Sequence, residues 1–129
     1  MSTVNRFEDL EVWQNAREIC KTIKEITQRK MFVRDFALID QITRSTGSIM
    51  DYIAEGFERD GTKEFIQFLS ISKGSVGEVR SQLHRAYDFN YIQKDQLDQL
   101  IIKLSSLSTK IQNLIQYLKT TNFKGHKYK

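Results

Sequence analysis

Few residues in this chain could carry out chemistry, and their spacing does not assemble a familiar catalytic or phosphate-binding motif. A segment at residues 53–75 holds three of the six glycines and several hydroxyls. It contains neither G-x-x-x-x-G-K-[ST] nor a G-x-G-x-x-G that opens a helix after a strand, the patterns that cradle phosphates. Ser75 stands in "GSVG", which is not the G-x-S-x-G elbow of a nucleophilic serine. We therefore interpret the segment as helix packing.

The two histidines and the single cysteine offer little more. His84 and His126 are too few to build a metal cluster, and a di-iron bundle would need a glutamate at Ser81, three residues before His84. Cys20 and His84 could in principle form a nucleophile and its base, but Cys20 lies in an apolar stripe typical of core positions. We expect a non-enzymatic protein with no catalytic residues, metal, cofactor or small-molecule substrate.

Composition restricts the class of protein further. The chain has 129 residues, 40% hydrophobic and 28% charged, which fits one globular domain. It has no proline, so long helices are permitted throughout. One cysteine cannot form an internal disulfide, and neither a signal peptide nor a long uncharged apolar run occurs. We expect a cytoplasmic protein without a membrane segment.

Apolar residues recur at helical spacing along nearly the whole chain. The stripes predict four helices, over residues 8–30, 34–59, 62–89 and 97–118. The second stripe begins at Phe36, and Thr62 is the expected cap of the third helix. Short connections favour an all-α, up-down-up-down antiparallel four-helix bundle over residues 1–118. Gly56, Gly74 and Gly77 fall inside helical stripes, where close helix approach is expected to offset their low helix propensity.

Positive charge is concentrated in the second half of the chain. Residues 1–64 hold 10 bases and 12 acids, whereas residues 65–129 hold 10 bases and 4 acids. Residues 119–129 carry four lysines and no acid, and they are expected to form a flexible basic tail. A polyanion such as a nucleic acid should prefer this half of the chain. A run of like charges is, however, more often simply a solvent-exposed surface with no binding role.

Two carboxylates near the end of the second helix raise a separate question. The carboxyl end of a helix carries a partial negative charge, which disfavours the carboxylates of Glu55 and Glu58. A positively charged group should therefore lie close to them. One interpretation is an i,i+4 pair between Glu55 and Arg59, and the other is a facing basic group from another chain.

Three segments carry a family resemblance. "FEDLEVWQNARE" at residues 7–18, "IAEGFERDGTKEFIQFLSISKGS" at residues 53–75 and "GEVRSQLHRA" at residues 77–86 resemble the four-helix-bundle proteins encoded in intervening sequences of 23S ribosomal RNA genes. That family is similar to the accessory variability protein of diversity-generating retroelements. The resemblance implies a homopentamer and an RNA or reverse-transcriptase-like partner, with no known catalytic residue. The matching signature or subunit-contact residues are Glu55, Gly56, Arg59, Lys73 and Gly74.

Two classes of function remain open. The first is an oligomeric scaffold that binds RNA or a nucleoprotein through basic groups, namely Lys73, Arg80, Arg85, Lys103, Lys124, Lys127 and Lys129. The second is a protein-binding or self-assembling bundle without a nucleic-acid role, in which Tyr52, Tyr87 and Tyr91 cover subunit contacts. The neutral body of the chain favours the second, and the basic tail favours the first.

Overall fold

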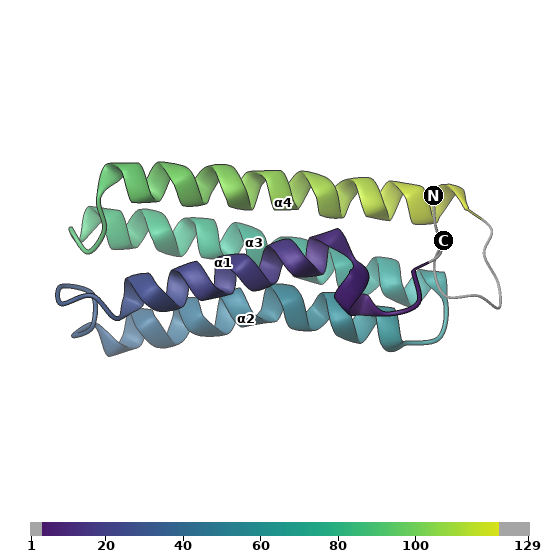
Figure 1. Ribbon diagram of the computed structural model, residues 1–129, viewed down its shortest axis with the longest axis horizontal. Helices are drawn as coiled ribbons and strands as arrows, with labels where there is room; N and C mark the ends of the chain where they lie inside the picture. Colours follow the sequence, from purple (N-terminus) through teal and green to yellow (C-terminus); the bar gives the residue numbers. More distant parts are fainter. Residues whose placement is uncertain (1–3, 122–129) are drawn as a thin grey trace.

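Four long helices form an elongated bundle in the computed structural model, which describes residues 4–121 (Figure 1). A 3-10 turn, η1 (Phe7–Asp9), precedes α1 (Glu11–Thr27), α2 (Phe36–Glu58), α3 (Thr62–Asp88) and α4 (Lys94–Thr120). Consecutive helices run antiparallel, and α1 also contacts α4, which closes the bundle. The predicted all-α four-helix bundle is confirmed, and no strand occurs within residues 4–121.

Several helix ends differ from the expected ones, and local features explain two of the differences. The first helix begins three residues late because residues 7–9 form η1 and Leu10 is extended, an arrangement that packs Phe7 edge-on against Trp13 with ring centroids 5.3 Å apart. Thr62 is not the cap of α3. Gly61 is the N-cap, and its φ of 101° is a conformation that glycine adopts at little cost.

Caps also fix the other two helices. The Asp35 carboxylate accepts a hydrogen bond from the Leu38 backbone N–H at the start of α2. Gln93 and Gln96 form a capping box at the start of α4. At its other end α4 continues to Thr120, so Lys119 lies in its last turn. The residues expected to be a tail begin inside a helix, and residues 122–129 lie outside the described part of the chain.

The predicted stripes supply most of the core. Fully buried side chains from three helices and a connector meet along the bundle axis, including Phe32, Phe57, Phe65 and Leu104. Phe36 is an exception, because 79% of it is exposed. It precedes Ile42 by six residues, which places it about 120° around the helix from that buried position. Its inclusion in the second stripe was therefore wrong.

The glycine prediction is confirmed at one position and wrong at two. A Cβ added at Gly56 would lie 2.5 Å from the Cβ of Phe68, so this glycine permits the close approach of α2 and α3. Gly74 and Gly77 are exposed, and an added Cβ at either would meet nothing within 4 Å. They lie on the outer side of α3, where no helix of the same chain approaches.

Two serines of the 53–75 segment, Ser72 and Ser75, serve packing, as expected. The buried Ser72 hydroxyl donates a 2.7 Å hydrogen bond to the Ile49 carbonyl of α2. Ser75 is also buried on the inner side of α3. Within residues 4–121, none of the helices combines the length and apolar content needed to cross a bilayer.

Candidate nucleic-acid interface

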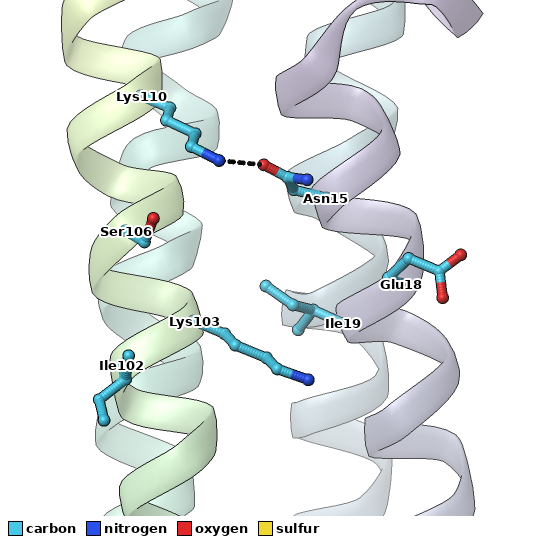
Figure 2. A pocket seen from close by; sticks show the side chains of 7 residues that line it. All are labelled: Asn15, Glu18, Ile19, Ile102, Lys103, Ser106 and Lys110. Carbon is cyan, nitrogen blue, oxygen red and sulfur yellow. Dashed lines mark hydrogen bonds between the residues drawn. The ribbon is translucent and has the colours of Figure 1, made fainter.

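The most open helix pair in the bundle is α1 with α4, and a surface groove runs between them. Figure 2 shows a pocket of about 330 Å³ in this groove. Its lining residues come from the two helices only: Asn15, Glu18, Ile19, Ile102, Lys103, Ser106 and Lys110. The buried Ile19 contributes an apolar wall, and the exposed Ile102 lies at the rim.

Two lysines of α4 point across this groove. The Lys110 ammonium donates to Asn15 Oδ1 at 3.1 Å and pairs with Glu11 Oε2 at 3.2 Å, so it ties α4 to α1. The Lys103 side chain extends toward α1 below Ile19. It forms no hydrogen bond or ion pair with any residue in the described range 4–121. Lys103 is therefore available to an external anion.

A second pocket continues the groove toward the end of α1. It measures about 140 Å³ and shares Lys103 with the first pocket. Its lining residues are Thr22, Glu25, Ile26, Arg29, Gln96, Gln99, Leu100 and Lys103. Glu25 offsets part of the charge, whereas Glu18 points out of the first pocket and pairs with Lys21 at 3.4 Å. We refer to both pockets together as the α1–α4 groove, with Arg29, Lys103 and Lys110 as its cations.

The structure does not bring the other predicted cations to this groove. Lys73 donates a 3.0 Å hydrogen bond to Gln112 Oε1 and so lies between α3 and α4. Arg85 donates to Gln41 Oε1 at 2.8 Å, between α2 and α3, and Arg80 is exposed on α3. Both partners are neutral amides, so neither hydrogen bond places a carboxylate beside the cation. Lys124, Lys127 and Lys129 lie outside the described residues.

Sequence reasoning missed Lys110 and Arg29. Lys103 and Lys110 are seven residues apart, which places them on the same side of a helix, so their alignment could have been predicted. The partner of Lys110 could not be predicted from such spacing, because Asn15 is 95 residues away along the chain.

The signature residues at the end of α2 form a local cluster. Arg59 Nη2 pairs with Glu55 Oε2 at 2.8 Å, and this hydrogen bond raises the pKa of Arg59. The same guanidinium lies 5.1 Å from the centroid of the Phe68 ring, which rests against Gly56. The predicted i,i+4 ion pair between Glu55 and Arg59 is thus confirmed. Lys73 and Gly74 lie farther along α3 and do not belong to this cluster.

The three tyrosines proposed for subunit contacts are all half-buried within the chain. Tyr52 packs against Phe68 with ring centroids 6.0 Å apart. Tyr91 stacks on Phe32 and donates a 2.9 Å hydrogen bond to Asp35 Oδ2. Tyr52 and Tyr91 therefore already support the monomer.

The Cys20 environment opposes nucleophilic chemistry. Its thiol donates to the Thr46 carbonyl at 3.4 Å and lies 3.6 Å from Met50 Sδ. Burial, with a smaller contribution from Asp51, raises the pKa of Cys20 from 9.0 to about 11. His84 is exposed on α3 and is not among its partners. In the described part of the chain, no three His, Cys, Asp or Glu residues form a group suited to a metal ion.

The raised pKa of Cys20 predicts that its thiol reacts slowly with alkylating agents. At pH 8 the thiolate fraction of folded Cys20 should be about a hundredfold below that of an ordinary cysteine, because the thiolate is the reacting species. Alkylation by iodoacetamide, followed by mass spectrometry, should therefore be about a hundredfold slower in the native protein than in the chain unfolded by guanidinium. Equal rates in the two states would contradict the burial of this thiol.

Comparison with known proteins identifies relatives of this bundle. The model of the 23S rRNA-intervening sequence protein family matches residues 8–113. A solved structure from Bacteroides thetaiotaomicron, a protein with unknown function from the S23 ribosomal protein family, shares the fold with a TM-score of 0.74 at 20% identity. The similarity covers 81% of this chain and 98% of that one. No curated protein matches the chain. Because the family model spans most of the bundle, including the α1–α4 groove, the chain belongs to the 23S rRNA-intervening sequence protein family.

Proposed function

We propose that this protein is a non-enzymatic, oligomeric scaffold that binds RNA, alone or within a nucleoprotein, through its cationic surfaces. The observation that carries the proposal is Lys103, an ammonium without a partner in the described range, which extends across the α1–α4 groove between Lys110 and Arg29. A row of cations beside a partly apolar groove suits the phosphates of a nucleic-acid strand.

Assembly would strengthen this weak site. The family resemblance favours a homopentamer, in which five copies of the groove would engage one RNA. Linked contacts raise the effective concentration of each further site, so the ring would bind more tightly than one chain. A reverse-transcriptase-like protein is the candidate partner for such a nucleoprotein. The competing function is a bundle that binds only proteins, and the test below includes it as an outcome.

The test removes the unpaired cation. Lys103→Gln should weaken binding of a labelled 23S ribosomal RNA fragment and lower the slope of log affinity against log salt by about 0.7 to 0.9 for each Lys103 in contact. Fluorescence anisotropy at several salt concentrations measures both quantities. The matched control is Lys63→Gln, an exposed lysine at the start of α3 and outside the groove.

Two results would overturn the proposal. Equal affinity and slope for Lys103→Gln and Lys63→Gln would remove the α1–α4 groove from RNA binding. The absence of any salt-sensitive RNA binding by the full-length protein would favour the protein-binding bundle instead.

A further inference from the structure

Large apolar side chains are exposed at one end of the bundle. The α1–α2 connector (residues 28–35) and the α3–α4 connector (residues 89–93) lie together there, at the left of Figure 1. Met31, Val33, Phe36 and Phe89 are all exposed at this end, and they are four of the six large exposed hydrophobics in residues 4–121. Phe36 is 79% exposed and Phe89 is 49% exposed. We call this surface the connector end.

The exposed rings rest on packed and hydrogen-bonded connectors. Phe32 is fully buried and stacks on Tyr91 with ring centroids 5.1 Å apart, and Tyr91 donates a hydrogen bond to Asp35. Phe89 packs edge-on against the same tyrosine at 5.7 Å. Asp35 also caps α2, so Phe36, the first residue of that helix, has a fixed backbone. The two exposed rings are therefore presented by connectors that are tied to each other.

Three cations lie in the same α1–α2 connector as Met31 and Val33. Arg29, Lys30 and Arg34 are exposed, and none of them forms an ion pair with another residue of the described range. The single acid of the same connector, Asp35, already accepts hydrogen bonds from Tyr91 and from the α2 backbone. The surface thus combines flat apolar rings with exposed positive charges.

We infer that the connector end binds single-stranded RNA, with bases stacked on Phe36 and Phe89 and phosphates held by Arg29, Lys30 and Arg34. This inference rests on the proposed function. It adds that the RNA is single-stranded and that the connector end is a second RNA-contacting surface beside the α1–α4 groove. Aromatic platforms beside cations are the usual device for single strands, because every base has a stacking face that a duplex hides. Arg29 also lines the α1–α4 groove, so a strand on the platform can continue toward Lys103.

A lipid surface fits the connector end less well. Asp88 is exposed directly before Phe89, so inserting that ring would bring a carboxylate to the membrane. A flexible single strand can place its phosphates beside the cations and away from Asp88. A continuous anionic lipid surface would contact Asp88 together with Phe89.

The experiment compares a flat ring with an aliphatic side chain at one exposed position. The probes are a labelled single-stranded RNA of about 12 nucleotides and the corresponding RNA duplex. Phe36→Leu should weaken single-strand binding about fivefold or more and leave duplex binding unchanged, whereas Phe36→Trp should retain wild-type affinity. The introduced indole should also lose fluorescence on stacking. Ile71→Leu, at an exposed residue in the middle of α3, is the matched apolar control.

Charge is tested separately. Lys30→Gln combined with Arg34→Gln should weaken binding and lower the salt slope, whereas Lys24→Gln combined with Lys63→Gln should change neither as much. Circular dichroism and light scattering check that each variant keeps its fold and mass, since all of these side chains are exposed.

The outcomes separate this inference from the function on which it rests. If single-strand and duplex RNA bind with equal salt dependence and Phe36→Leu binds like wild type, the connector end is not a stacking platform, although RNA binding stands. If no RNA binds in any form, both proposals fail. Binding to phosphatidylserine vesicles that survives Phe36→Leu but is lost when Lys30→Gln is combined with Arg34→Gln, without RNA binding, would make the connector end a membrane surface and overturn the inference. A change of oligomeric mass in Phe36→Leu would make it a subunit contact, which also overturns it.

Discussion

Gly56→Ala is expected to lower the free energy of unfolding by about 3 kcal/mol. The added methyl would lie 2.5 Å from the Cβ of Phe68 and 3.1 Å from Cδ1 of Phe65. A Cβ atom cannot rotate away from its backbone, so α2 and α3 must separate to admit the methyl. Separation would also weaken the contact between Phe57 and Phe65, whose ring centroids are 5.8 Å apart. Urea unfolding followed by circular dichroism, at one fixed protein concentration, measures the loss.

Gly74→Ala and Gly77→Ala are the controls, and they should have the opposite sign. Both glycines are helical, exposed and free of neighbours within 4 Å, so alanine should stabilise each by about 0.5 to 1 kcal/mol through helix propensity. A Gly56→Ala variant as stable as wild type would show that α2 and α3 are not tightly opposed. A loss of stability at Gly74 or Gly77 would indicate that another chain covers the outer side of α3.

The contrast among these glycines shows what periodicity can predict. All three glycines occur inside helical stripes, so spacing alone predicted the same role for each of them. In the structure Gly56 contacts Phe68, whereas Gly74 faces outward. Periodicity gives an angle around a helix axis, but the neighbour in that direction is set by the whole bundle. The helices themselves were predictable because each stripe and most caps are local.

The candidate site was predictable only in part for the same reason. Lys103 was selected from charge, and its side of α4 follows from its spacing to Lys110. That this side faces α1 across an open groove depends on how two helices from opposite ends of the chain pack. Phe36 was a different error: it lies about 120° around α2 from the buried Ile42, so helical spacing itself places it outside the core-facing stripe.

RNA binding by the assembled protein is expected to fall about a hundredfold or more when salt rises from about 50 to about 200 mM, if about five phosphates are contacted. The physical cause is counterion release, which scales with the number of phosphates that cations neutralise. A single chain offers few such contacts, so the effect should require the ring, and light scattering should show that its mass is unchanged over this salt range. Anisotropy titrations with the full-length protein measure the slope.

Deleting residues 122–129 should reduce both the affinity and that slope, by about two or more in the slope if all three lysines of the segment contact phosphate. The deletion removes Lys124, Lys127 and Lys129, whereas Leu118, the last buried residue of α4, remains. Fold and assembly should therefore survive. Glutamine at the same three positions in the full-length chain is the matched control and should reproduce the loss, because charge alone is its cause. A truncated protein that binds as tightly as the full-length one would exclude the tail and leave the α1–α4 groove and the connector end as the RNA contacts.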